Sequence, residues 1–140
     1  MALIRLTGSY RAEPYIYRAG VNSISGSAVI SRYTRSAVSG DVVYVSGRNS
    51  GDTGPYTVDL THWDFLYHPP SDEWVRNVSS ASRGALTTCA GPGDSGGAVF
   101  STVSGGVQAA GIFSGFLVCR IYFTPIYDTF LALPGDVLLH

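Results

Sequence analysis

Hydrophobic and polar residues alternate along most of this chain in short runs that are rich in β-branched and aromatic residues. This period-two pattern is typical of strands with one buried face. Seven runs carry it, at residues 26–31, 41–47, 56–68, 73–79, 96–101, 107–116 and 120–126. The stretches between them, such as "SGRNSGDTGP" at 46–55, are rich in glycine and proline and predict turns. The pattern indicates an all-β fold with six or seven strands.

One segment near the C-terminus follows a helical pattern instead. In "YDTFLAL", residues 127–133, apolar side chains recur at roughly helical spacing, and Pro134 is expected to end the helix. A closed antiparallel barrel leaves no exposed strand edges. We therefore expect the strands to close into such a barrel, with the short helix packed outside it.

Length and charge exclude several classes of protein. The 140 residues are enough for one hydrophobic core. The net charge is −1 and the basic residues are scattered arginines, so no basic stripe is present to follow a nucleic-acid backbone. No apolar run reaches the ~20 residues of a membrane-spanning helix. We expect neither a nucleic-acid nor a membrane partner.

Cysteines and carboxylates narrow the chemistry further. Cys89 and Cys119 could be free thiols or one disulfide. The composition, rich in serine, glycine and tyrosine, is typical of secreted proteins and favours the disulfide. The acidic residues are spread through turns and strands without the close pairing that metal ligation needs. We expect no metal ion and no cofactor.

The stretch "CAGPGDSGGAVF", residues 89–100, places a serine in a glycine-rich turn. A hydroxyl becomes a strong nucleophile only when a base removes its proton, and the anion formed on attack needs donors already in place. Gly93 can turn so that its amide and that of Ser95 converge on one point, and Gly96 and Gly97 leave room for a substrate. The alternative is an ordinary glycine-rich hairpin.

The context of this turn resembles a known family. "GDSGG", the strand "AVF" after it, Cys89 six positions before the serine and "AAGIFSG" after it resemble the chymotrypsin-like serine proteases, closest to the bacterial streptogrisin and α-lytic branch. "SGRNSG" looks like a loop early in that family's C-terminal barrel, and "YFTPI" like the strand before its final helix. The resemblance runs from about Gly40 to Leu133 and implies a single six-stranded antiparallel Greek-key barrel over residues 21–140.

The resemblance also implies roles for individual residues. Ser95 would be the catalytic nucleophile, and the amides of Gly93 and Ser95 would form the oxyanion hole. Ser114, Gly115 and Phe116 would form the edge strand that pairs with the backbone of a peptide or protein substrate. The family usually has glycine at the position of Phe116, so we expect a narrowed or remodelled specificity pocket.

Three further positions are structural in this family. Cys89 and Cys119 match the disulfide that brackets the specificity pocket, and the stretch between Cys119 and "YFTP" is shorter than in the family. Asp94 is the aspartate of the motif. Val45 stands where the bacterial branch often has an arginine that pairs with this aspartate. Arg48 is a nearby substitute, and we predict that it pairs with Asp94.

The histidine and aspartate that the family uses to activate its serine are not evident. His62 lies in a predicted strand of the same barrel and is expected to be structural. His68 is expected to lie in a loop, and His140, at the chain end, to have no fixed position. "MALIRL" resembles the family's strand that directly follows the aspartate. Residues 1–20 are therefore interpreted as a remnant strand and interdomain connector; the alternative is an ordinary strand of a self-contained fold.

Two functions follow as hypotheses. The first is the C-terminal half of a secreted serine endopeptidase, with its signal and pro-region outside this chain, inactive alone because the triad is incomplete. The second is a non-catalytic protease-like module that binds a peptide or partner. In either case the face that would meet a second barrel is expected to be apolar, which predicts association with the missing N-terminal barrel or a self-associated dimer.

Overall fold

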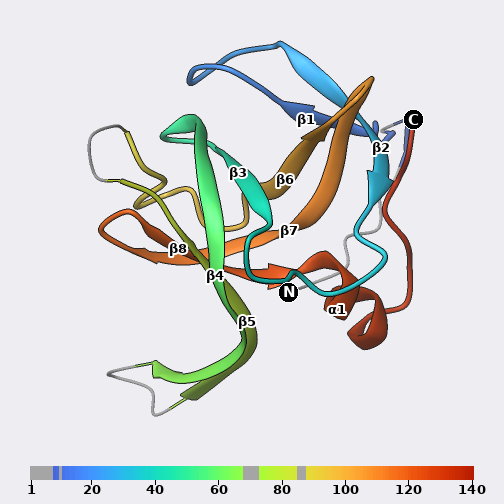
Figure 1. The fold of residues 1–140 in the computed structure, drawn as a ribbon. Helices are drawn as coiled ribbons and strands as arrows, with labels where there is room; N and C mark the ends of the chain where they lie inside the picture. The colour runs from blue at the N-terminus through green and yellow to red at the C-terminus, as the bar shows by residue number, and fades with distance from the viewer. Residues whose placement is uncertain (1–7, 10, 68–72, 85–87) are drawn as a thin grey trace.

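Six antiparallel strands form a closed ring in the computed structural model, which describes residues 8–9, 11–67, 73–84 and 88–140 (Figure 1). The ring consists of β3 (Val42–Gly47), β4 (Gly51–Tyr67), β5 (Glu73–Ser82), β6 (Ala98–Val103), β7 (Gly106–Leu117) and β8 (Arg120–Pro125). Its pairing order is β3–β4–β5–β8–β7–β6, and β6 pairs back with β3. The predicted six-stranded all-β barrel is confirmed.

The connections within the ring are those of a Greek key. β6, β7 and β8 follow one another as antiparallel neighbours, whereas β5 lies beside β8 and not beside β6. A fourth strand that returns to lie beside the far end of such a trio defines the motif. The connection from β5 to β6 therefore crosses the end of the barrel, and it carries the "GDSGG" turn.

A hairpin outside the ring was only partly predicted from the sequence. β2 (Gly26–Arg32) pairs in parallel with β7, and β1 (Tyr15–Tyr17) pairs antiparallel with β2. The sequence predicted β2 and only an extended connector at β1, because three residues are too few to establish an alternating pattern. The strand expected in "ALIRL" lies outside the described residues. The domain boundary at residue 20 stays a prediction.

The turn predicted at residues 46–55 is shorter than expected. β3 ends at Gly47 and β4 begins at Gly51, so only three residues separate the strands. Val43 pairs with Tyr56 and Val45 with Thr53, which leaves two residues of β4, one of them Pro55, opposite one residue of β3. Proline has no amide hydrogen and is tolerated in a strand at such a bulge. The tight turn lies directly beside the serine turn.

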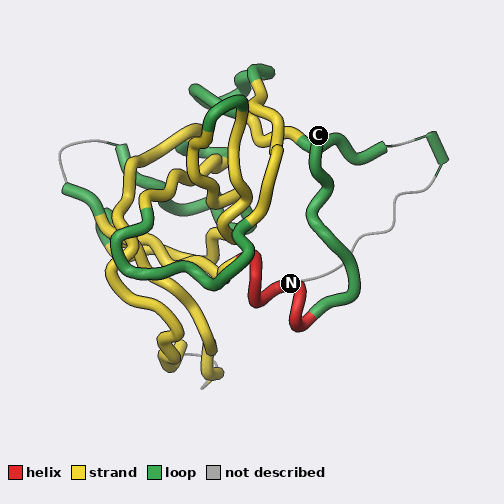
Figure 2. Tube along the Cα trace, turned by 45° about the vertical axis from the view of Figure 1, so that its right-hand side comes forward, coloured by secondary structure: helices red, strands yellow, loops and turns green. Residues whose placement is uncertain are grey.

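The helix forms where it was predicted, and the chain then turns back. α1 (Ile126–Ala132) is followed directly by Leu133 and Pro134. From there the chain runs along the side of the barrel towards β1 and β2 (Figures 1 and 2). The amide of His140 donates a hydrogen bond of 2.9 Å to the carbonyl of Val29. The expectation that His140 has no fixed position is wrong, because backbone pairing holds the chain end.

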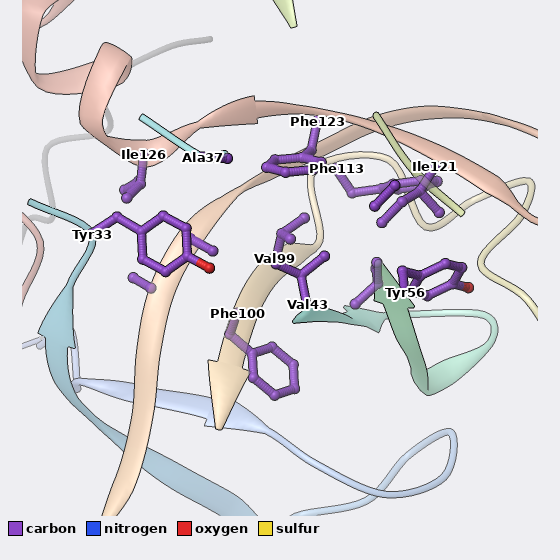
Figure 3. Packing of buried hydrophobic residues seen from close by; sticks show 14 of the residues in the cluster. Tyr33, Ala37, Val43, Tyr56, Val99, Phe100, Phe113, Ile121, Phe123 and Ile126 are labelled. Carbon is purple, nitrogen blue, oxygen red and sulfur yellow. The ribbon is translucent and has the colours of Figure 1, made fainter. Parts of the chain in front are cut away.

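The core lies inside the ring and is built from the inward positions of the strands (Figure 3). Alternation along β8 buries Ile121 and Phe123, and alternation along β3 buries Val43 and Val45. Each such side chain contributes about 1.5–3 kcal/mol of burial free energy. The largest fully buried side chains are Tyr56, Phe100, Phe113 and Phe123. Two of these lie close to the serine turn. Phe100 lies on β6, which begins directly after the turn, and the carbonyl of Phe113 on β7 accepts a hydrogen bond from Gly96.

The hairpin of β4 and β5 extends beyond the ring and away from the barrel (Figure 1). Its strands carry half-exposed aromatic residues, Trp63 and Trp74. α1 has seven residues, and no helix in the described part of the chain is long and apolar enough to cross a membrane.

Candidate active site

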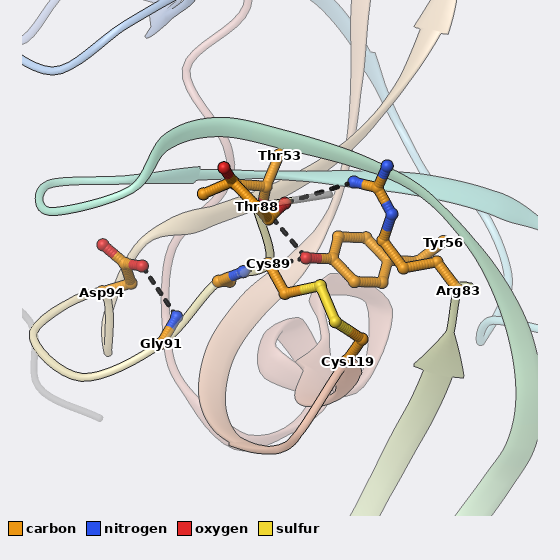
Figure 4. Close-up of a disulfide and its surroundings, with 9 residues drawn as sticks. Thr53, Tyr56, Arg83, Thr88, Cys89, Gly91, Asp94 and Cys119 are labelled. Carbon is orange, nitrogen blue, oxygen red and sulfur yellow. Dashed lines mark hydrogen bonds between the residues drawn. A yellow bond between two sulfur atoms is a disulfide. The ribbon is translucent and has the colours of Figure 1, made fainter. Parts of the chain in front are cut away.

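Asp94 is the fixed point of the serine turn. Its side chain is 1% exposed, and its carboxylate accepts hydrogen bonds from three backbone amides. Asn49 donates to Oδ1 at 2.7 Å and Ser50 to Oδ1 at 3.0 Å. Gly91 donates to Oδ2 at 2.9 Å (Figure 4). A buried carboxylate is tolerated only when it is paired or hydrogen-bonded. These bonds therefore tie the serine turn to the β3–β4 turn.

The predicted partner of Asp94 is wrong. Arg48 is exposed, and the hydrogen bonds to Asp94 come instead from the backbone amides of Asn49, Ser50 and Gly91 and from the side chain of Ser50. Burial alone would raise the pKa of the Asp94 carboxyl, but the hydrogen bonds from Gly91, Ser50 and Asn49 outweigh it and hold the pKa below its ordinary value of 3.8. The carboxyl is therefore ionised near neutral pH without a cationic partner.

Ser95 lies exposed at the surface, on a turn whose other amides are occupied. The amide of Asp94 donates to Gly91, that of Gly96 to Phe113 and that of Gly97 back to Asp94. Within the described residues, the amides of Gly93 and Ser95 donate to no protein acceptor. The two amides predicted to form the oxyanion hole are thus available to a ligand.

The backbone conformation of Gly93 explains why the motif has glycine at this position. Its φ is +86°, which side chains rarely adopt. A Cβ at this position would lie 2.2 Å from the side-chain nitrogen of Asn49, which itself donates to the carbonyl of Pro92. A larger residue here would be strained by the positive φ and would displace the Asn49 side chain.

The predicted substrate edge lies on β7. β6 pairs with β7 up to Ile112, and at Phe113 the amide donates to Gly97 while the carbonyl accepts from the amide of Gly96. Beyond it, Gly115 and Phe116 pair only with β8. Residues Ser114, Gly115 and Phe116 therefore keep one edge without a partner strand in the part of the chain that the structure describes. Phe116 is 42% exposed on this edge.

The disulfide between Cys89 and Cys119 joins the approach to the serine turn to the β7–β8 hairpin (Figure 4). Its Cα atoms are 5.5 Å apart, and the bond closes 30 residues of chain. Only Val118 and Cys119 separate β7 from β8. The hairpin therefore has no room for a loop that could widen a pocket beside Phe116, in keeping with the short stretch noted in the sequence.

The described histidines are engaged away from the serine turn. His62, on the projecting hairpin, has its Nδ1 atom 2.6 Å from Oδ1 of Asn77. The His140 ring packs edge-on against Tyr15, with 5.6 Å between ring centroids. His68 lies outside the described residues. Neither described histidine is brought to Ser95 by these contacts.

The possible metal ligands in the described part of the chain are not closely grouped. Among the described residues, no three histidine, cysteine, aspartate or glutamate side chains gather closely enough to hold a metal ion. The acidic residues instead form pairs and small networks. One network joins Asp59 to Ser80, Ser82 and Arg120.

Two parts of the site were missed by the sequence analysis. The first is the pair of amides from Asn49 and Ser50, which carry no side-chain signature. The second is the segment from Tyr17 to Ser23, which lines a groove beside Ser95. This segment has no clear hydrophobic pattern, and Arg18 is its one notable residue. The partner of Arg18 is Asp52, which only the fold brings beside it.

Comparison with known proteins adds support at the level of structure. No protein-family model matches the chain, and no curated protein matches it either. Two similar solved structures are proteases. The first, described as a glutamic acid-specific serine protease that uses a histidine triad in substrate binding, has a TM-score of 0.69 and 25% identity over 91% of this chain and 62% of its own.

The second similar structure is the chymotrypsin of Cellulomonas bogoriensis, with a TM-score of 0.65 and 24% identity over 89% of this chain and 63% of its own. The chain thus spans less than two thirds of either protein. The strand order and the disulfide agree with the resemblance seen in the sequence. The chain is a protease-related domain with the fold of the chymotrypsin-like serine proteases.

Proposed function

We propose that this chain is the C-terminal, nucleophile-bearing half of a secreted serine endopeptidase. The observation that carries the proposal is the serine turn. Ser95 is exposed, and its own amide and that of Gly93 donate to no acceptor among the described residues. The turn is fixed by the buried Asp94 and lies beside an edge of β7 that has no partner strand in the described part of the chain. The disulfide fits an oxidising compartment, which supports secretion.

In the proposed reaction, a peptide lies along Ser114, Gly115 and Phe116, so that its scissile carbonyl carbon faces Ser95. The Ser95 oxygen forms a bond to that carbon while its proton passes to a base. The amides of Gly93 and Ser95 stabilise the resulting oxyanion. The carbon–nitrogen bond then breaks, the amine leaves with a proton, and water hydrolyses the acyl-enzyme to restore Ser95.

The base and its aspartate are proposed to come from another barrel, as in the family. The chain spans only 62–63% of the similar proteases, and its described histidines contact Asn77 and Tyr15. In serine proteases, removing the histidine lowers turnover by about 10⁶, while binding and the oxyanion hole retain roughly 10³–10⁴ over water. This chain alone is therefore proposed to be nearly inactive.

A second candidate is a protease-like module that binds a peptide or partner without catalysis. The engagement of His62 by Asn77 is compatible with this candidate as well as with the first, because a histidine held in this way is not positioned beside Ser95. Both candidates predict a partner: a second barrel, or a copy of this chain as a dimer. Sedimentation velocity at increasing concentration would reveal the dimer, and a strictly monomeric profile would contradict it.

The experiment treats the folded chain with a fluorophosphonate and reads intact mass and peptide maps, with Ser95→Ala as control. Imidazole is then added as a free base. We expect slow labelling at Ser95, faster than at the exposed Ser39 and Ser104, and a selective acceleration by imidazole, because the oxyanion donors act only at Ser95.

Each part of the proposal can fail separately. Stoichiometric labelling within minutes and without imidazole would show that a base is present in this chain, which contradicts inactivity. Equal labelling of Ser95, Ser39 and Ser104, in a chain that still melts cooperatively, would contradict a protease site and leave the binding module as the better reading.

A further inference from the structure

A groove of about 600 Å³ opens beside Ser95 and does not include the β7 edge. It is lined by Tyr17–Ser23, by the end of β3 and its turn up to Arg48, by Gly51 and by Gly93–Gly97. Its size is within the range of ligand sites in proteins. The serine turn therefore separates two surfaces, the β7 edge and this groove.

We propose that this groove binds the part of a peptide substrate that follows the scissile bond, and that Arg48 selects an acidic side chain there. The proposal rests on the proposed function. If the residues before the scissile bond pair with Ser114–Phe116, the residues after it must leave across the serine turn. The groove begins at that turn, with Gly93 and Ser95 in its lining.

The wall of the groove is firmly attached to the barrel. The hydroxyl of Ser46 donates a hydrogen bond of 2.6 Å to the carbonyl of Tyr17, and the amide of Asp52 donates one of 2.8 Å to Ala19. Nε of Arg18 lies 2.6 Å from Asp52 Oδ2. The Arg18 guanidinium also lies 4.6 Å from the centroid of the Phe100 ring. A wall held in this way is already formed before a ligand arrives.

The charge of the groove comes from one residue. Arg18 is neutralised by Asp52, and Asp94 is buried and hydrogen-bonded by amides. Arg48 is exposed and forms no ion pair within the described part of the chain. An unpaired guanidinium in a partly enclosed groove attracts a carboxylate. Tyr17 and Val21, both more than half exposed, add apolar contact area.

The test follows amide resonances of the isotopically labelled chain during titration with three extended peptides. The peptides differ only at the second position after the central bond, which is Glu, Gln or Lys. We expect shifts at Gly20–Ser23, Arg48 and Gly93–Gly97, with the Glu peptide binding about two- to fivefold more tightly than the Gln peptide at low salt. The preference should weaken at high salt because exposed charges are screened.

A charge reversal sharpens the test. Arg48→Glu should reverse the order of affinity so that the Lys peptide binds best. The matched control is Arg11→Glu, which changes the net charge equally but lies in a neighbouring hollow that shares only Tyr17 with the groove. The order of affinity should be unchanged in this control. The spectra themselves report whether each variant is folded.

The outcomes separate this proposal from the proposed function. Shifts confined to Ser114–Phe116, or equal affinities for the Glu and Lys peptides, would overturn the groove proposal and leave the protease-like edge intact. An order of affinity that follows net charge in both Arg48→Glu and Arg11→Glu would also overturn it. Absence of shifts at both surfaces at millimolar peptide would contradict the proposed function as well.

Discussion

The carboxylate of Asp94 and the backbone amide of Asn49 are 45 residues apart in the chain and 2.7 Å apart in space. This bond, with those from Ser50 and Gly91, fixes the residue next to Ser95 against the β3–β4 turn. A conformation held from two sides is rigid before any substrate binds. That rigidity is what oxyanion donors need, because their value depends on being in place before charge develops.

Removing the charge of Asp94 should destabilise the whole domain. In Asp94→Asn, one side-chain atom becomes a donor that faces the backbone donors, so at least one hydrogen bond to a buried charge is lost. We expect a loss of about 2–3 kcal/mol in the free energy of unfolding, measured by urea denaturation. The control is Asp136→Asn, whose 63%-exposed carboxylate pairs with Arg32 and should cost less than about 1 kcal/mol. Equal losses would contradict the argument.

Stability should fall in acid. The pKa of the Asp94 carboxyl is lowered because its hydrogen bonds outweigh burial, and that of Asp59 is lowered for the same reason by Ser80, Ser82 and Arg120. A group whose pKa is lower in the folded state adds stability above its unfolded value of 3.8 and loses it as the pH falls through the folded value. Between pH 5 and 7 these two carboxyls are ionised in both states, so they should not change the urea midpoint. The midpoint should decrease below about pH 4.

The same titration distinguishes Asp94 from the other carboxylates. The stability difference between the native chain and Asp94→Asn should shrink as the pH falls below about 4, because the native carboxyl then becomes neutral too. A difference that stays constant down to the acid transition would show that the substitution acts through packing and not through charge.

The barrel could be predicted from the sequence because strands such as β3 and β8 bury alternate residues. Val43 and Val45 in β3, and Ile121 and Phe123 in β8, alternate with more exposed residues and so reveal the strands directly. β1 has three residues and one buried side chain, Ile16, which gives no such period. Its position follows from pairing with β2, an interaction that no local pattern records.

The site was predictable only where its chemistry lies in side chains. Ser95 and the cysteines could be recognised from their spacing. The partners of Asp94 could not, since backbone amides are present at every residue except proline. The resemblance expects an arginine at Val45, so Arg48 was selected as a nearby substitute, whereas the fold satisfies Asp94 with the amides of Asn49, Ser50 and Gly91.

Two glycines of the serine turn should respond differently to the same substitution. Gly93 and Gly96 have φ values of +86° and +87°, so Gly→Ala imposes a similar backbone strain of about 1–2 kcal/mol at both. A Cβ at Gly96 meets nothing within 4 Å, whereas one at Gly93 also displaces the Asn49 side chain from Pro92. Urea denaturation should show Gly93→Ala to be the less stable variant, by about 1 kcal/mol. The reverse order would contradict the turn geometry.

The disulfide should be a major source of stability. In the chain-entropy model, a bridge across 30 residues stabilises the folded state by about 3–4 kcal/mol, because it restricts the unfolded chain. Replacing both Cys89 and Cys119 by alanine should lower the free energy of unfolding by that amount, and a reducing agent should do the same to the native chain while leaving the double variant unchanged. A loss below about 1 kcal/mol would mean that the Tyr56 hydroxyl, which accepts a hydrogen bond of 2.9 Å from the amide of Ala90, and the pairing of β7 with β8 hold this region without the bridge.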